Sequence, residues 1–416
     1  PTTAKREAQR IAVEARITES LPALLDAIAA GDSAALQTLD AIVAQQKRFF
    51  VAQDPDIARG SVVVYRGGRL DAEPDVPTGA PWPAIDATTL SAYLRRHFQR
   101  DSVRADKVRL IPGGFSKETV FFTLIDDADG TRRELVIRKD MPYPFIDRTV
   151  VNEIGVLTAL HARGFPVARP LWLESGFDHF GGPFLVSERV AGTSNAASWT
   201  SDPARARQAC DELARVLAEL HRQPPAELGY PAELCARSAG ELMAAEIERW
   251  TQLFRARRCE SFPLQELPLL WLARNIPAEL FQRPARVVHG DFGFHNLMFD
   301  EHGRITALLD WEFSGLGDPT QDLCFVRLFV EPLMPWADFL QRYADYGGVP
   351  LCESAAFFFD LWTKTRNSIG CVASQKLFDV DLPHEMKFAL TGYVFGPYLH
   401  IDECESLLAH IRQTPA

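Results

Sequence analysis

The apolar residues of this chain change their spacing twice, and this change constrains the fold more than any other feature of the sequence. In the first part they recur at helical spacing, for example at Leu21, Leu25 and Ile28. A Gly- and Pro-rich stretch at 66–83 can continue neither a helix nor a central strand, and we interpret it as a linker. Short β-type runs come next, and helical periodicity dominates from Asp202 onward. The sequence therefore predicts two or three amphipathic N-terminal helices, then a small β-rich lobe, then a large helical lobe.

The β-type runs predict a small antiparallel sheet with one helix in its connections. Strands are expected at 108–111, 120–125, 135–138, 171–173 and 184–190, a turn at 126–130, and the helix at 148–162. Two further β-like runs, at 286–289 and 305–309, interrupt the helical part and flank polar loops. The expected domains are a helical N-terminal extension and linker at 1–83, an N-lobe at 84–190 and a C-lobe at 191–416.

Charge and cysteine usage exclude several classes of function. The formal net charge is −11, from 44 Lys and Arg against 55 Asp and Glu, so the chain lacks the broad basic face that nucleic acid requires. The seven cysteines are odd in number, widely spread and never in a C-x-x-C pair, which is typical of reduced thiols in a cytosolic protein. The charged opening residues do not form a secretion signal, and no apolar run is long enough for a bilayer span. We therefore expect a cytoplasmic protein without a nucleic-acid or membrane partner.

The densest cluster of polar residues in an apolar frame lies at 287–323. Asp291, Asn296 and Asp310 each stand in or beside a loop that follows an apolar strand, which is how a rigid scaffold presents functional groups. Two carboxylates and one amide oxygen suit metal-assisted phosphoryl transfer, in which one Asp orients and deprotonates a hydroxyl and the other two oxygen ligands hold Mg²⁺.

These motifs resemble the aminoglycoside phosphotransferase and choline kinase group, distant relatives of protein kinases. The resemblance rests on His289-Gly290-Asp291 with Asn296 five residues after the Asp, and on Asp310-Trp311-Glu312 followed by Gly317-Asp318-Pro319. It implies an α+β, bilobal, protein-kinase-like fold that binds ATP and Mg²⁺. In it, Asp291 is the catalytic base, and Asn296 and Asp310 bind the metal. The runs LVIRKD and LLDWEFSGLGDP are most similar to the kinase portions joined to acyl-CoA dehydrogenases.

The same resemblance identifies a phosphate-covering loop. Gly113, Gly114, Ser116 and Thr119 match its Gly-Gly-x-Ser-x-x-Thr pattern between two β-type runs. Small residues there let backbone N–H groups approach phosphate oxygens. A Gly-Gly turn by itself would more often be a plain hairpin.

A strand-borne cation and the hinge between the lobes should complete the nucleotide site. The resemblance favours Arg138, paired with the helical Glu153, as this cation. Lys139 is the alternative, and alternation along the strand places its side chain on the opposite face from that of Arg138. The segment at 184–193 resembles the hinge, whose backbone from Glu188 to Val190 would contact adenine.

Four other polar residues of the cluster have structural explanations. We expect His289 to brace its loop by donating to backbone, His295 to make a local contact, and Asp318 to cap the following helix. Asp322 should brace the catalytic loop. For Glu312, just after the metal-binding Asp310, a structural role is favoured over contact with metal or substrate.

The acceptor is the least constrained part of the prediction. Aromatic residues at 357–362 lie where the family builds its acceptor site, although part of such a run must be core because consecutive residues face different sides of a helix. Few acids accompany them, which favours a small-molecule hydroxyl of an apolar or acyl-bearing compound, such as a hydroxyacyl-CoA, over a polycationic aminoglycoside. A catalytically inactive nucleotide-binding module is the rival class, and a protein kinase is disfavoured by the missing activation segment. The N-terminal helices could mediate a homodimer contact, cover the acceptor cleft or pad the small lobe.

Overall fold

The structure is a computed structural model of the 416-residue chain. It describes residues 3–58, 84–111, 116–141, 148–195, 197–200, 202–257, 263–375 and 386–413. Two compact units are formed from segments that are distant in sequence. The first consists of Pro1–Pro74, Met243–Ala278 and Phe357–Ala416, and the second of Asp75–Leu242 and Glu279–Ala356. The three consecutive lobes expected from the sequence stay a prediction, and the linker at 66–83 lies outside the described residues.

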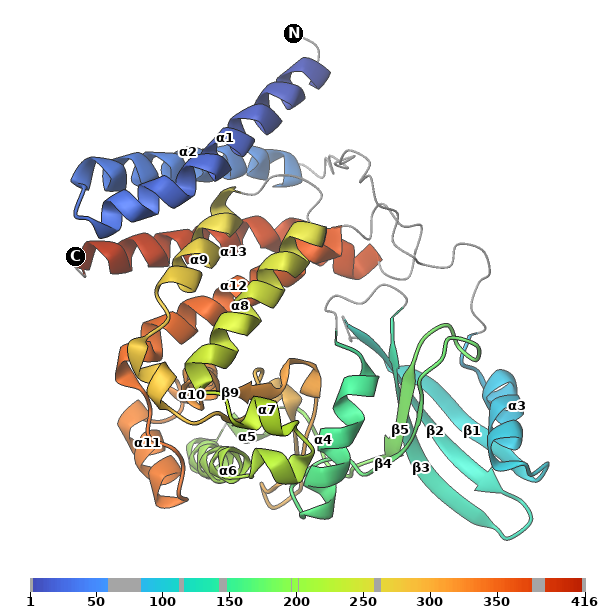
Figure 1. Cartoon of the computed structure of the whole chain (residues 1–416). Helices are drawn as coiled ribbons and strands as arrows, with labels where there is room; N and C mark the ends of the chain where they lie inside the picture. Colours follow the sequence, from blue (N-terminus) through green and yellow to red (C-terminus); the bar gives the residue numbers. More distant parts are fainter. Residues whose placement is uncertain are drawn as a thin grey trace. The chain divides into compact units, whose positions relative to one another are not determined.

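An antiparallel five-stranded sheet forms the N-terminal part of the second unit (Figure 1). Its order is β1-β2-β3-β5-β4, with β1 at Val103–Ile111, β2 at Lys117–Asp126, β3 at Thr131–Asp140, β4 at Pro170–Glu174 and β5 at Phe184–Glu188. Two small sheets follow, one pairing β6 (Arg286–Val288) with β9 (Gly315–Gly317) and one pairing β7 (Leu297–Phe299) with β8 (Ile305–Leu308). The α+β class with a β-rich part before a largely helical part is therefore confirmed.

Helices make up most of the remaining described residues. The second unit holds α3 (Ala87–Phe98), α4 (Val150–Ala162), α5 (Ala197–Thr200), α6 (Pro203–His221), α7 (Ala232–Cys235), α10 (Thr320–Val330) and α11 (Trp336–Asp345). The first unit holds α1 (Thr3–Ala29), α2 (Ser33–Ala58), most of α8 (Ala239–Arg257), α9 (Pro263–Arg274), α12 (Ala356–Gln375) and α13 (Met386–Gln413). Within the described ranges, none of these helices has an apolar stretch that would span a bilayer.

Helix α3 is an element that the sequence analysis did not predict. Asp86 caps it, because its carboxylate accepts hydrogen bonds from the backbone N–H groups of Thr88 and Thr89, both at 2.8 Å. Its buried Leu90 and Leu94 join the core of the five-stranded sheet, and Ser91 Oγ accepts from the N–H of Ala105 in β1 at 2.9 Å. The helix therefore lies beside β1 (Figure 1).

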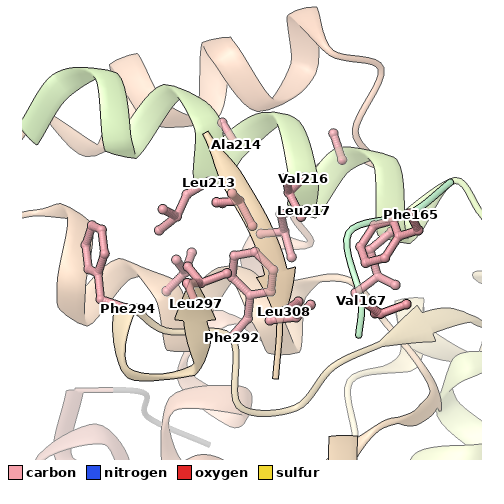
Figure 2. Close-up of a cluster of buried hydrophobic side chains, with 14 of the residues drawn as sticks. Phe165, Val167, Leu213, Ala214, Val216, Leu217, Phe292, Phe294, Leu297 and Leu308 are labelled. Carbon is pink, nitrogen blue, oxygen red and sulfur yellow. The ribbon is translucent and has the colours of Figure 1, made fainter. Parts of the chain in front are cut away.

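A second hydrophobic core supports the polar loops at 289–296 and 309–314. In Figure 2, Leu213 and Leu217 of α6 lie close to Phe292 and Leu308, which belong to the chain around those loops. All four side chains are buried. The loops therefore rest on a packed surface, which fixes the backbone from which their polar side chains extend.

The helices of the first unit pack the two ends of the chain together. Asp26 of α1 pairs with Arg274 of α9 at 3.3 Å, and Cys404 of α13 donates to the carbonyl of Leu264 in α9 at 3.1 Å. Within the aromatic run, Phe358, Phe359, Leu361 and Trp362 are at most 2% exposed, so this part of the run is core.

Candidate active site

Asp322 of α10 holds the loop that follows strand β6. It is fully buried, and its two carboxylate oxygens accept the backbone N–H groups of His289 and Gly290, each at 2.7 Å. His221 of α6 adds a third hydrogen bond at 3.1 Å, and the Tyr343 hydroxyl lies 2.7 Å from the other ring nitrogen of His221. Burial alone would raise the pKa of Asp322, but its hydrogen bonds with these groups outweigh burial and keep the pKa below the ordinary value. Asp322 therefore braces the loop as an anion.

His289 is a second brace on the same loop. Its Nε2 lies 2.9 Å from the carbonyl oxygen of Leu309, so this nitrogen donates, and its Nδ1 accepts from the N–H of Asp291 at 3.3 Å. Burial lowers the pKa of His289, which favours this neutral tautomer. The ring thus joins the Asp291 loop to the chain just before Asp310.

Asp291 extends from this braced loop, and its side chain is 21% exposed. Asn296 Nδ2 donates to its Oδ2 at 2.8 Å and to its backbone oxygen at 2.9 Å. His295 Nε2 lies 3.2 Å from the same Oδ2. Burial alone would lower the pKa of His295, but its bond with Asp291 raises the pKa overall. The carboxylate is therefore oriented by two neighbours while it stays open to a reactant.

Asp310 stands near the start of the second polar loop, two residues after β8, and its side chain faces the sheet. Its Oδ1 accepts a hydrogen bond from Arg138 of β3 at 2.8 Å. Burial would raise the pKa of Asp310, but the Arg138 guanidinium outweighs it and the pKa lies below the ordinary value. The backbone of Asp310 is left-handed, with φ 62° and ψ 71°, a conformation that is costly for a residue other than Gly.

The helical acid Glu153 has a cationic partner that the sequence analysis did not identify. Lys117, the first residue of β2, places its ammonium 3.2 Å from Glu153, 3.0 Å from Glu312 and 3.5 Å from Asp140. All four side chains are 2–5% exposed. Burial would lower the pKa of Lys117, but these carboxylates outweigh it and raise the pKa. Glu312 has a pKa raised to about 7, because it is buried and lies near Asp310, an effect that Lys117 partly offsets.

The residues around Asp310 fit a nucleotide and a hard cation. The Nε of Arg138 is buried and, among the described residues, lacks a hydrogen-bond acceptor, as expected of a donor that faces a phosphate oxygen. Asn296 uses its amide nitrogen toward Asp291, which leaves its side-chain oxygen for a metal. Across the described part of the chain, three or more His, Cys, Asp or Glu side chains nowhere converge as a metal cage. An amide and one carboxylate with substrate phosphates suit Mg²⁺, which is seldom held by a protein cage.

The structure describes only part of the predicted phosphate-covering loop. Gly113 and Gly114 lie outside the described residues. Ser116 is buried beside Glu312, and Thr119 pairs with Arg138 across β2 and β3. Contact of these four residues with phosphate stays a prediction.

The structure describes the predicted hinge residues Glu188 and Val190 and the alternative cation Lys139. Glu188 ends β5; its side chain pairs with Arg133 at 2.9 Å, and its backbone N–H donates to the carbonyl of Arg169 at 2.9 Å. Contact of this segment with adenine stays a prediction. Val190 lies two residues after β5 and is half-buried. Lys139 points away from the site, because its ammonium pairs with Glu118 at 2.7 Å and donates to the carbonyl of Phe180.

Asp318 has the structural role expected for it. Its Oδ1 accepts the N–H of Thr320 at the start of α10 at 2.9 Å, and its Oδ2 pairs with Arg283. Because the side chain is 1% exposed, it anchors α10 and with it Asp322.

Comparison with known proteins agrees with this geometry. Residues 107–358 match the model of the APH phosphotransferase enzyme family, which is more than half of the chain. The chain belongs to this family. The resemblance of the sequence motifs to this group of small-molecule kinases is thereby confirmed. The matched residues include every side chain of the site described above.

Individual relatives are more distant. Acyl-CoA dehydrogenase family member 11 of Rattus norvegicus is 28% identical over 299 residues, 68% of this chain but only 36% of the rat protein. Viomycin phosphotransferase of Streptomyces vinaceus is 28% identical over 172 residues, 40% of this chain and 57% of that protein. A candidate aminoglycoside phosphotransferase from Ralstonia eutropha shares the fold, with a TM-score of 0.53, 23% identity, and coverage of 77% of this chain and 98% of that one. The chain thus spans about a third of the length of its curated rat relative.

Proposed function

We propose that the protein transfers the γ-phosphate of ATP to a hydroxyl of a small molecule with the help of Mg²⁺. The observation that carries the proposal is the convergence of Asp291, Asn296 and Asp310 beside Arg138. Hydrogen bonds of 2.8 Å run from Asn296 to Asp291 and from Arg138 to Asp310, and the N–H of Leu309, next to Asp310, donates to the carbonyl of Asn296 at 2.7 Å. Membership of a phosphotransferase family supports it. The cytoplasmic location and the homodimer stay predictions.

Each group has a distinct task in this reaction. The acceptor oxygen forms a bond to the γ-phosphorus, the bond from that phosphorus to the β-phosphate oxygen breaks, and ADP leaves. Asp291 orients the hydroxyl and takes its proton, with Oδ2 held by Asn296 and His295. Arg138 donates to phosphate oxygens. Mg²⁺ held by Asn296 and Asp310 would supply neutralisation of phosphate charge, which together with positioning accounts for most phosphoryl-transfer catalysis.

The surroundings of Asp291 favour an apolar or acyl-bearing acceptor. The ring of His295 lies 5.6 Å from that of Phe329 and 6.2 Å from that of Phe325, both in α10. Leu328, on the same helix, is 65% exposed. A polycation would be better served by carboxylates at these positions. Similarity to a family member of acyl-CoA dehydrogenases agrees with a hydroxyacyl-CoA as acceptor.

An antibiotic acceptor is the second candidate, because viomycin phosphotransferase is also a relative. A nucleotide-binding module without activity is the third, and the presence of all three of Asp291, Asn296 and Asp310 disfavours it.

The test is ADP formation from ATP with and without Mg²⁺ across a panel that contains 4-hydroxyacyl-CoAs, choline, a macrolide, viomycin and an aminoglycoside. We expect Mg²⁺-dependent ADP formation that a hydroxyacyl-CoA stimulates. Stimulation by viomycin or an aminoglycoside instead would establish the antibiotic alternative. Tight Mg·ATP binding without turnover on any acceptor would favour the inactive module, and absence of nucleotide binding would contradict the proposal.

A further inference from the structure

The positive charges of the site are divided between two strands. Arg138 of β3 pairs with Asp310, whereas Lys117 of β2 pairs with Glu153 of α4. The two cations thus form their ion pairs with different acids from neighbouring strands of the sheet, although Arg138 also lies near enough to Glu153 and Glu312 to attract them electrostatically. This division leaves Arg138 beside the predicted metal ligand and gives Lys117 a role in holding the surrounding segments.

Lys117 joins four segments at one buried point. Its ammonium contacts Asp140 at the end of β3, Glu153 within α4, and Glu312 two residues after Asp310. Asp140 also accepts the N–H of Val150, the first residue of α4, at 3.1 Å. Without the ammonium, three carboxylates would face one another in a space closed to water, where like charges repel strongly. The contact with Glu312 therefore ties the Asp310 turn to the sheet and to α4.

Asp310 needs such an anchor because of its backbone. A left-handed non-glycine residue is retained only where its surroundings determine the conformation. On its C-terminal side, the buried Trp311 donates from its ring nitrogen to the carbonyl of Leu308 at 3.0 Å. Glu312 is the next residue, and its carboxylate is held at 3.0 Å by Lys117. These two contacts fix the turn that aims the Asp310 carboxylate.

We propose that Lys117 is a positioning residue for the metal ligand Asp310, acting through its contact with Glu312. The proposal rests on the proposed function, because it assumes that Asp310 binds the metal of a metal–nucleotide complex. Removal of groups that orient a metal ligand typically lowers metal affinity by about 10–100-fold. Lys117 touches neither metal nor nucleotide in this scheme, so the loss should appear in the metal-dependent part of nucleotide binding.

The experiment compares the affinity of the full chain for AMP-PNP with and without Mg²⁺ by calorimetry. In wild type, Mg²⁺ should tighten binding. Lys117→Met should reduce that metal-dependent gain about tenfold or more, while the metal-free affinity changes little. Glu312→Gln should reduce the gain as well, and the double variant should lose no more than the larger single loss, because both residues act through one contact. Lys139→Met is the matched control, since Lys139 is also buried and ion-paired but lies outside this cluster.

Each outcome decides between the alternatives. A folded Lys117→Met variant that keeps the wild-type gain would overturn the proposal. If that variant does not fold, Glu312→Gln alone decides, and a wild-type gain in Glu312→Gln would overturn the proposal equally. Additive losses in the double variant would also contradict a shared contact. If wild type itself binds AMP-PNP no tighter with Mg²⁺, the proposed function fails, and with it the role of Lys117.

Discussion

Truncating Asp322 to Ala should destabilise the protein strongly, because three buried donors depend on its carboxylate. The N–H groups of His289 and Gly290 and the ring of His221 would each lose an acceptor. An orphaned buried donor costs about 1–3 kcal/mol, so the three sum to roughly 3–9 kcal/mol. Relaxation and entry of water into the space left behind reduce this to about 3–5 kcal/mol, the range for breaking a buried ion pair.

The free energy of unfolding can be followed by thermal denaturation at neutral pH. At roughly 2–4 °C per kcal/mol for a unit of 150–250 residues, we expect the melting temperature of Asp322→Ala to fall by about 6–20 °C. Asp345→Ala is the matched control, since Asp345 is exposed and accepts one hydrogen bond from Gln341. Because the pKa of Asp322 lies below the ordinary value, its contribution is present at neutral pH and is lost as the pH falls through that lowered pKa. A melting temperature within about 2 °C of wild type would refute the reasoning.

Three further predictions concern other residues. Glu403 is fully buried with a pKa raised by burial to about 8, so the folded state holds its proton more tightly than the unfolded state. Wild-type stability should therefore fall as the pH rises from about 4.5 to 8, by on the order of a few kcal/mol, whereas urea denaturation of Glu403→Gln should show a flatter pH profile. Arg138→Gln should weaken ATP binding by about tenfold or more in calorimetry, because a charged hydrogen bond to phosphate is lost; unchanged affinity would move the phosphate contact elsewhere. Gly293→Ala would place a Cβ 2.7 Å from Phe329 and 2.8 Å from the His295 ring. We therefore expect a lower kcat, with circular dichroism showing that the fold is retained. A wild-type kcat would show that this packing does not position Asp291.

The sequence was informative where the chemistry is local. Asp291 and Asn296 are five residues apart in one loop, and their motif was enough to predict that they belong to one site, where the structure joins them by a hydrogen bond. Asp322 and His289 were expected to brace that loop, and both do so through backbone groups.

Contacts between residues far apart in the chain could not be predicted from the sequence. Lys117 and Glu312 are 195 residues apart, and nothing in the residues around Lys117 marks it as buried. The sequence analysis paired Arg138 with Glu153; in the structure Arg138 attracts Glu153 electrostatically but forms its ion pair with Asp310, and Lys117 of the neighbouring strand forms the ion pair with Glu153. Helix α3 was missed although a signal was present, since Asp86 precedes Thr89 and apolar residues at helical spacing.

The role of Asp291 as the base is the central claim, and the most direct measurement compares Asp291→Asn with wild type in two assays. The substitution keeps the size of the side chain and removes the proton acceptor. We predict that kcat for Mg²⁺-dependent ADP formation falls by about 10²- to 10⁴-fold, while the affinity for Mg·AMP-PNP stays near that of wild type. Asp300→Asn, in a turn where Asp300 accepts only local backbone N–H groups, should change neither quantity. Wild-type turnover by Asp291→Asn would contradict the account.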